Sequence, residues 1–466
     1  MTSGGFIDGI QVEVVPLNSF KFQVVYAAPG TFTLPINEGG DGYAHNFQVN
    51  WGDGSPVSNI TSYDDDNRVH TYAAAGTYIV TMVGTCEWFA FNNAGDKTKI
   101  TQLIGFTGDM GFKILNFYGC SNLTSIVGLG QMAALTTADN IFHNCSSLSV
   151  IPTDCFRYAT SVIGFLWAFA NTTLTTLPTD CFRYNTLVTS FARAFYNCYL
   201  TTIPTDCFRY NILVTNFSYA FYYCSLTTIP TDCFKYNTLV TDFSCIFCGC
   251  YNLTTIPADC FRYNILVTTF SFAFQNAAII AIPTDCFKYN ILVTDFSFAF
   301  QNTGLTSIPT DCFRYNTLVT YFDSLFVGCS SLTSIPTDCF RYNTLVIDFS
   351  HIFLNCSNLT TVPADCFRYN TLVLEFSLAF YGCSALQQHS TIFYAAGGAA
   401  TRFLNQTVNF TNCFSRGSFS GTQGTAPDLW NCNFGTGTPT TTGCWGGAGN
   451  SLTSLDNYGD IPGGWK

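Results

Sequence analysis

The stretch IPTDCFKYNTLVTDFS, residues 229–244, recurs in near copies along the middle of the 466-residue chain. Nine copies of its Pro-x-Asp-Cys-Phe segment follow one another at a spacing of 26 or 27 residues. This period is typical of a solenoid in which each unit forms one coil. One unit cannot bury its own apolar face, so we expect coils that stack in register, about 4.8 Å apart. The segments begin at Pro152, Pro178, Pro204, Pro230, Pro257, Pro283, Pro309, Pro336 and Pro363.

Each unit has a consistent local pattern. The LTTIP run at 226–230 alternates apolar and hydroxyl residues and predicts a short strand. The TDCFRYN run predicts a single helical or 3₁₀ turn. The run at 292–302, LVTDFSFAFQN, spaces apolar residues by three and four and predicts a short amphipathic helix. The predicted fold class is therefore mainly β with short helices.

The chain contains 23 cysteines, an odd number, so they cannot all pair within one chain. One interpretation of the main cysteine column is a disulfide or metal ladder. The other is a column of small buried apolar side chains, which we favour because unpaired cysteine packs as a small hydrophobe. This structural ladder consists of Cys155, Cys181, Cys207, Cys233, Cys260, Cys286, Cys312, Cys339 and Cys366.

Charges also recur once per unit. An aspartate stands three residues before a lysine or arginine in every repeat, from Asp154 and Arg157 to Asp365 and Arg368. Rows of opposite sign can pair within and between coils. The aspartates cancel the field of the cations, which disfavours polyanion binding.

Composition excludes several functions. A net charge of −11 offers no basic stripe for nucleic acid and disfavours an anionic membrane. No apolar run is long enough to cross a bilayer. No catalytic motif is present, so we expect no enzyme and no cofactor.

Cys245, Cys248 and Cys250 suggest zinc, but Cys250 belongs to a second repeated column and no partner histidine stands nearby.

The unit at 217–234, FSYAFYYCSLTTIPTDCF, resembles the leucine-rich repeats of the BspA-like surface protein family. The resemblance covers about residues 100–390. It implies a leucine-rich-repeat solenoid with a binding rather than a catalytic role. Departures from the family pattern are the Pro-Thr-Asp-Cys-Phe turn and the abundance of phenylalanine.

The runs FQVNWGDGSPVSN from Phe47 and VHTYAAAGTYIVTMVG from Val69 resemble the signature strands of a polycystic kidney disease (PKD) domain. This resemblance implies a small PKD/Ig-like β-sandwich at the N-terminus. Carboxylates in its loops are candidate calcium ligands, although such a run is more often a solvated loop. The candidate ligands are Asp53, Asp64, Asp65 and Asp66.

From about Ala395 the period is lost, and glycine, threonine, serine and asparagine dominate. A solenoid needs its last apolar edge covered, which predicts a C-terminal cap, with a docking tip as the alternative. The predicted domains are a sandwich at 1–98, a solenoid at 99–390 and a cap or tip at 391–466.

One face varies between units while the core columns hardly change. The residue between serine and alanine in FSxAF varies from unit to unit, and so does the residue three positions later. These columns predict a surface for a ligand or partner, although a helix surface also drifts when nothing constrains it. The candidate binding residues are Arg193, Tyr196, Tyr219, Tyr222, Phe272, Phe298, His351 and Tyr381.

The predicted function is a non-enzymatic structural or adhesion protein. Its expected partner is a receptor protein, a glycan or a neighbouring surface subunit, and it is a possible homo-oligomer without membrane insertion. The N-terminal residues show no secretory signal, which favours a virion surface, as a phage fibre or decoration component. The alternatives are a bacterial cell-surface or secreted adhesin and a self-assembling extracellular filament.

Overall fold

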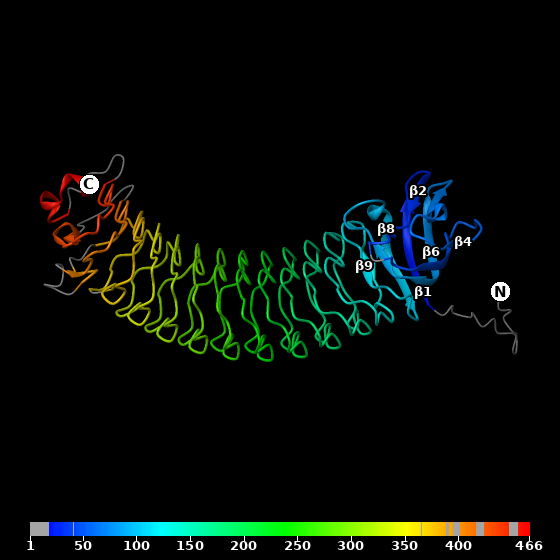
Figure 1. Cartoon of the computed structure of the whole chain (residues 1–466), viewed down its shortest axis with the longest axis horizontal. Coiled ribbons are helices and arrows are strands. Elements are labelled where there is room, and N and C mark those ends of the chain that lie inside the picture. The colour runs from blue at the N-terminus through cyan, green and yellow to red at the C-terminus, as the bar shows by residue number, and fades with distance from the viewer. Residues whose placement is uncertain are drawn as a thin grey trace. The chain divides into compact units, whose positions relative to one another are not determined.

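The structure is a computed structural model that describes residues 18–40, 42–364, 366–387, 391–394, 401–415, 424–446 and 455–466. The chain forms two compact units. The first contains residues 1–199 and 206–213, and the second contains residues 200–205 and 214–466. Figure 1 shows a group of β-strands in the first unit and successive coils in both.

Six strands of the first unit form one sheet in the order β10-β8-β1-β6-β3-β4. Neighbours are antiparallel except β10 and β8, which are parallel. Alternate residues of β1 and β3 are buried, as Phe20, Phe22 and Phe47 show, because alternate side chains point to one face. The strands are β1 (Ser19–Tyr26), β3 (His45–Asn50), β4 (Ser58–Ile60), β6 (Gly76–Cys86), β8 (Ile100–Thr107) and β10 (Ser125–Ile126).

Two smaller sheets complete this region. β2 (Gly30–Thr33) pairs antiparallel with β5 (Val69–Tyr72), and β7 (Trp88–Ala90) pairs parallel with β9 (Ile114–Asn116). Short 3₁₀ helices precede β5 and β8. Because β8 and β10 lie beyond residue 98, the main sheet continues past the predicted domain boundary. The helices are η1 (Asp66–Arg68) and η2 (Lys97–Lys99).

Beyond this region the chain forms coils of 26 or 27 residues. Isolated parallel bridges join equivalent positions of successive coils, for example Asp242 to Thr269 and Thr269 to Asp295. This arrangement is consistent with the predicted repeat solenoid. Two longer coils follow in the second unit, since Asn409 bridges both Glu375 and Thr440. The coil stack therefore continues beyond the point where the sequence period is lost.

The amphipathic helix predicted at 292–302 is wrong, because this segment is a series of turns. The N–H groups of Phe296, Phe298 and Phe300 donate to carbonyls of the next coil at 3.2, 3.1 and 3.0 Å. Phe298 and Asn302 have left-handed φ values of 59° and 55°. In a right-handed helix these N–H groups would donate to carbonyls four residues earlier in the same segment, and every φ would be negative. Neither condition holds here, so no helix forms.

The run predicted as a strand, LTTIP, forms isolated parallel bridges rather than a regular strand. Thr255 bridges Ala281, and Ser334 bridges Thr361. The run after its proline is a chain of turns, in which the N–H groups of Cys233 and Lys235 donate to carbonyls three residues earlier.

Phenylalanine columns fill the core of the coils. Phe261 stacks on Phe287 at a centroid distance of 6.3 Å, and Phe287 stacks on Phe313 at 6.3 Å. All three rings are fully buried. Burial of each ring contributes about 2 to 3 kcal/mol, so the columns supply a large share of the driving force for stacking.

A buried asparagine column runs beside the phenylalanines. Nδ2 of Asn290 donates to the carbonyl oxygens of Phe261 and Asn264 in the preceding coil, at 3.1 and 2.9 Å. The side chain thus satisfies two buried carbonyl groups that would otherwise lack a donor. The buried asparagines are Asn185, Asn211, Asn237, Asn264, Asn290, Asn316, Asn343 and Asn370.

All 23 cysteines are buried thiols in the structure. The nine of the predicted structural ladder have between 0% and 5% of their surface exposed. In the second column Sγ of Cys329 donates to the carbonyl of Phe300 in the preceding coil, at 3.2 Å. Within the described ranges, no group of three or more Cys, His, Asp or Glu residues could hold a metal ion.

The C-terminal part of the second unit buries tryptophan. Trp445 stacks on Phe414 at 5.6 Å and lies 5.6 Å from Trp465. No helix in the described part of the chain has the length and apolar character needed to cross a bilayer. The short 3₁₀ helices here are η4 (Leu429–Asn431), η5 (Tyr458–Asp460) and η6 (Gly463–Trp465).

Candidate functional site

The predicted binding residues lie on one segment of each coil, and all eight are half-buried. Arg193 and Tyr196 belong to the first unit, and the other six belong to the second. Each residue of the FSxAF column has a left-handed backbone, with φ of 56° at Arg193 and 59° at Phe298. We call this column and the residues three positions later the left-handed face.

Most residues of the FSxAF column have large side chains, at a backbone conformation that favours glycine and asparagine. Two neighbouring coils use asparagine there, Asn140 before the column and Asn412 after it. The nine coils between them do not, although φ is 54° to 59° throughout. Their residues are Trp167, Arg193, Tyr219, Cys245, Phe272, Phe298, Ser324, His351 and Leu378.

A second left-handed column, four residues later, provides an internal comparison. Eight of its nine residues are asparagine or glycine, and Tyr223 is the exception. With the same backbone conformation, the second column is almost entirely asparagine or glycine, whereas the first column has a large side chain in seven of its nine coils. The second column consists of Asn171, Asn197, Tyr223, Gly249, Asn276, Asn302, Gly328, Asn355 and Gly382.

Aromatic rings of the left-handed face stack between coils. In the first unit His143 stacks on both Tyr118 and Trp167, at centroid distances of 4.3 and 5.2 Å. The guanidinium of Arg193 lies 5.3 Å from the Trp167 ring, and the Tyr196 ring lies 5.0 Å from it. This cluster forms a half-exposed aromatic platform.

In the second unit the Phe272 and Phe298 rings stack at 4.4 Å, and the Tyr219 and Tyr222 rings lie 5.6 Å apart. The side-chain amide of Gln275 donates to that of Gln301, which belongs to the same pair of coils as the stacked phenylalanines.

A shallow hollow of about 350 Å³ lies on this face of the second unit. Phe298 and His351, both predicted from sequence, line it, together with Asp323, Ser324 and Leu354. Asp323 accepts a hydrogen bond from Oγ of Ser297 at 2.5 Å. The hollow therefore combines an aromatic ring, an imidazole and a carboxyl group.

Asp323 is the polar group of this hollow that sequence reasoning missed. Desolvation raises its pKa, and the nearby Asp348 and Asp295 carboxylates add to that effect. Its signal in the sequence was that aspartate replaces the serine of FSxAF in this one coil. Trp167 was also missed, although it falls in the same column as Arg193.

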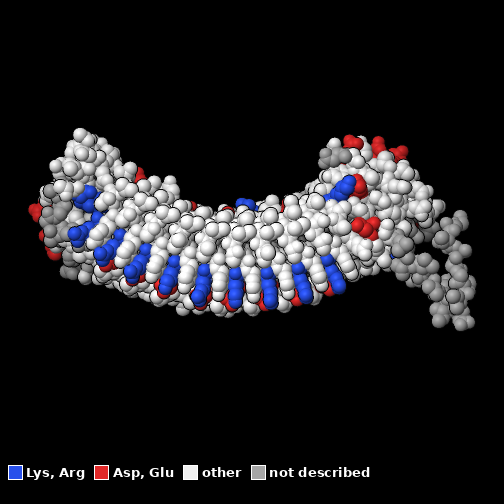
Figure 2. All heavy atoms as spheres, turned by 60° about the horizontal axis from the view of Figure 1, so that its bottom comes forward, with Lys and Arg blue, Asp and Glu red and all other residues white. Residues whose placement is uncertain are grey.

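Figure 2 shows the lysines and arginines of the charge ladder along one edge of the coils, with acidic side chains beside them. In eight coils a lysine or arginine, with 35–49% of its side chain exposed, lies 3.1–4.0 Å from the aspartate three residues earlier. Cations of the ladder also contact a tyrosine ring of the neighbouring coil. Arg314, for example, lies over Tyr315 of its own coil and over Tyr342 of the next. The predicted pair of Asp365 with Arg368 lies outside the described residues.

Because the ladder of residues 214–387 contains equal numbers of aspartates and cations, it carries no net charge there. The surplus negative charge of these coils resides on residues that stand one or three positions before the FSxAF column. They are Asp242, Asp295, Asp323, Asp348 and Glu375.

The candidate calcium ligands lie in two separate turns. Asp53 accepts from the N–H of Ser55 and pairs with Nε2 of His70 at 2.8 Å. Desolvation acts to raise the pKa of Asp53, but hydrogen bonds from Ser55 and His70 outweigh it and lower the pKa to about 2.

The other three carboxylates follow one another at the start of η1. Asp65 accepts from the N–H groups of Thr61 and Asn67, and Asp64 accepts from Oγ of Ser62. Asp66 is exposed. These bonds account for Asp64 and Asp65 as turn and cap residues, and Asp66 lies in the first turn of η1.

No protein-family model matches the chain, and no curated protein matches it. Among solved structures, the Toll–Spatzle complex of Drosophila is similar with a TM-score of 0.31 and 14% identity, over 62% of this chain and 42% of that chain. A TLR13–ssRNA13 complex is similar with a TM-score of 0.24 and 12% identity, over 59% of this chain and 52% of that chain. The function is therefore inferred from the geometry of the coils themselves.

Proposed function

We propose that the protein is a non-enzymatic recognition protein that binds a receptor protein or glycan through the left-handed face. The observation that carries this proposal is the contrast between the two left-handed columns. A residue other than glycine or asparagine costs roughly 1 to 2 kcal/mol at such a φ. Nine coils retain side chains such as tryptophan, phenylalanine and histidine there, which favours a role for the side chains themselves.

The chemistry of the face suits recognition. Half-buried aromatic rings bury large areas at little entropic cost, and such rings are enriched at interfaces. The Phe272–Phe298 stack beside Asp323 offers a flat apolar surface next to a hydrogen-bonding carboxyl. Sugar rings and protein side chains both fit that combination.

The setting that we propose is a virion surface, as a phage fibre or decoration component. The 23 buried thiols support it, because secreted proteins with many cysteines commonly pair them in disulfides, whereas thiols are typical of a reducing compartment. The leucine-rich-repeat and PKD-like resemblances, which are compatible with surface display, are part of the same proposal. A bacterial adhesin is the alternative, and coding sequences for capsid or tail proteins beside this one would decide against it.

The proposal is tested with the purified chain on a glycan array and on a panel of bacterial cells. Replacing Phe272 and Phe298 by alanine should weaken binding at least about tenfold, because the stacked surface is lost. The matched control replaces two exposed rings of the charge ladder, Tyr289 and Tyr315, by alanine. Equal binding by both double variants would contradict the proposal.

One observation favours self-association as a second function. Six coils of the second unit each carry a leucine at the same position, and each of these leucines exposes between 37% and 48% of its surface. A repeated apolar row of this kind can join copies of the chain. Sizing the protein over a hundredfold range of concentration tests this, and a constant mass would exclude it. The row is Leu239, Leu266, Leu292, Leu318, Leu345 and Leu372.

A further inference from the structure

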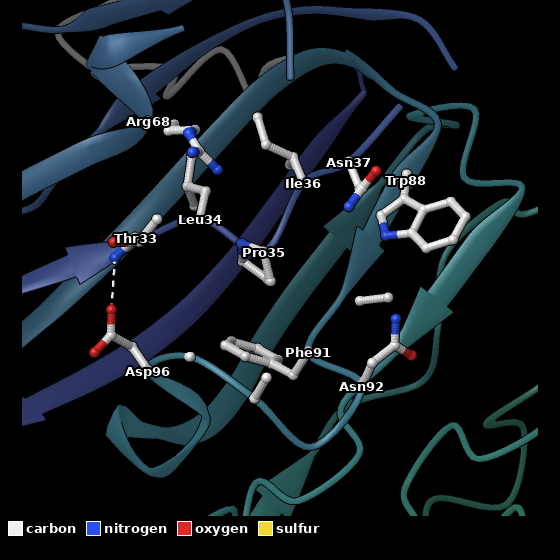
Figure 3. Close-up of a pocket in the computed structure, with 13 residues that line it drawn as sticks. Thr33, Leu34, Pro35, Ile36, Asn37, Arg68, Trp88, Phe91, Asn92 and Asp96 are labelled. Carbon is white, nitrogen blue, oxygen red and sulfur yellow. Dashed lines mark hydrogen bonds between the residues drawn. The ribbon is translucent and has the colours of Figure 1, made fainter. Parts of the chain in front are cut away.

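Another candidate site lies in the first unit. It is far in sequence from the residues of the left-handed face that belong to the second unit. A hollow of about 310 Å³ opens between the segment that follows β2 and the loop that follows β7 (Figure 3). Pro35 and Phe91 form part of its apolar wall, and Asn37, Trp88 and Asn92 line its polar side. None of these residues was singled out by the sequence.

Trp88 is held in place from behind. Its ring packs on Tyr43 at a centroid distance of 5.2 Å. A Cβ on Gly39 would lie 2.7 Å from the ring, so this left-handed glycine allows the close approach. In Figure 3 the indole nitrogen of Trp88 is on the edge of the ring that faces the hollow. It donates no hydrogen bond to any of the other residues drawn there.

Two asparagine side chains are oriented by their acceptor oxygens. One side-chain amide atom of Asn37 accepts from the N–H of Gly39 at 2.9 Å and is therefore the oxygen Oδ1. The other terminal atom of that amide is then the donor nitrogen Nδ2. Oδ1 of Asn116 accepts the N–H of Asn92, which leaves Nδ2 of Asn116 to donate to Oδ1 of Asn92 at 2.8 Å. In Figure 3 the free ends of both amides, the nitrogens, point toward the space between them.

Three neutral N–H donors thus border one space, which calls for a ligand with acceptor oxygens. The apolar wall of Pro35 and Phe91 calls for a small apolar group beside that oxygen. The hollow also has one side chain of each charge, Arg68 and Asp96, which favours a neutral ligand. An acetamido group combines a carbonyl acceptor with a methyl group.

The main chain around the hollow argues against a peptide strand. The N–H of Ala90 already donates to the carbonyl of Pro35 at 2.8 Å, and the N–H of Thr33 donates to Asp96 at 2.8 Å. A peptide that adds to a sheet edge needs such groups to be available. A sugar does not need available main-chain groups, because it binds through side-chain donors and ring contacts.

We propose that this hollow binds the acetamido group of an N-acetylated sugar. Two of the three donors of Trp88, Asn37 and Asn92 donate to the two lone pairs of the acetyl carbonyl, and the third donates to a hydroxyl oxygen of the sugar. The acetyl methyl packs on Pro35 and Phe91. This site does not depend on the left-handed face or on its function.

The test is saturation-transfer NMR with the full chain and free N-acetylglucosamine. Saturation should be strongest at the acetyl methyl, with a dissociation constant on the order of 1 to 10 mM, as expected for one sugar unit. Glucose, which lacks the acetamido group, should bind at least about tenfold more weakly. Trp88→Phe keeps a ring but removes the donor and should weaken binding at least about fivefold. Tyr289→Ala, an exposed ring of the charge ladder that belongs to neither proposed binding site, should bind like the unchanged chain.

Equal binding of glucose and N-acetylglucosamine would overturn the proposal, as would full binding by Trp88→Phe. Tighter binding of N-acetylglycine methylamide than of the sugar would overturn it in favour of a peptide. Circular dichroism checks the fold of each variant. If Trp88→Phe is unfolded, Asn37→Ala decides, because Asn37 is exposed and its loss should still weaken binding.

Discussion

Left-handed residues are the most unusual single positions in the coils. The backbone N–H of Phe298 donates to the backbone carbonyl of Asp323 in the next coil, and the N–H of Asn302 donates to the backbone carbonyl of Val327. A negative φ would turn these N–H groups away from their acceptors, so the bonds between coils hold both residues in place. Only the choice of side chain remains open. Asparagine at 302 lowers the backbone cost, whereas phenylalanine at 298 does not.

Two phenylalanines of one coil should therefore respond differently to alanine. Phe298→Ala should lower the free energy of unfolding by about 1 kcal/mol, the value of a half-exposed ring stack. Phe300→Ala should lower it by about 3 to 5 kcal/mol, because that ring is fully buried. Urea denaturation measures both.

A third variant at the same position checks the backbone. Phe298→Gly should be more stable than Phe298→Ala, the reverse of the usual order, because φ is 59° there. If alanine proves the more stable, position 298 is not left-handed.

Each coil satisfies the buried carbonyls of the coil before it with an asparagine, and the last of these coils needs another donor. Arg402 supplies it. Its Nη2 donates to the carbonyls of Phe367 and Asn370 at 3.3 and 2.9 Å, and its Nε donates to Phe393 at 3.3 Å. Asn343 carbonyl receives the equivalent bond from Asn370. Desolvation lowers the pKa of Arg402 to about 10, so the buried guanidinium is still charged at neutral pH.

Arg402→Ala should destabilise the second unit by about 3 kcal/mol or more, because three buried carbonyls lose their donor. Arg402→Lys should not restore stability, since an ammonium cannot reach the carbonyls as a planar guanidinium does. Arg341→Ala is the control and should leave stability nearly unchanged, because its ion pair with Asp338 is exposed. Thermal and urea denaturation report these effects, and equal losses at 402 and 341 would contradict the role of Arg402.

Across the molecule, thiols occupy the interior where most proteins place aliphatic side chains. Burial raises the pKa of Cys329 to about 11 and that of Cys198 to about 12, against about 8.5 for an exposed thiol. Burial acts in the same direction on the cysteines of the ladder, such as Cys286. The folded protein therefore holds its thiol protons more tightly than the unfolded chain.

Stability should consequently depend on pH on the alkaline side. The pKa of each buried thiol is higher in the folded state, so its contribution is complete below about pH 8.5 and is lost as pH rises toward 11 or 12. Each thiol contributes a slope of about 1.4 kcal/mol per pH unit in that window. Urea denaturation at several pH values should show constant stability from pH 6 to 8 and a steep fall above 9. Unchanged stability up to pH 10.5 would contradict the burial of these thiols.

Several features were predictable from local sequence. The 26- or 27-residue period predicted stacked coils, and repeated Phe and Cys positions lie buried as such columns should. Asn290 was not singled out, because asparagine is usually exposed and only a neighbouring coil's carbonyls make its burial favourable. The helix at 292–302 was predicted wrongly for a related reason. Its spacing of three and four fits both a helix and a turn whose N–H groups bond to another coil.

The sequence by itself determined that the chain repeats and which side chains face the core, because apolar periodicity depends only on the order of residues. Only the tertiary structure decided the left-handed backbone of the variable columns, since hydrogen bonds between coils impose it. The hollow beside Trp88 likewise exists only in the fold. Its donors at 37 and 92 are far apart along the chain, and no local pattern connects them.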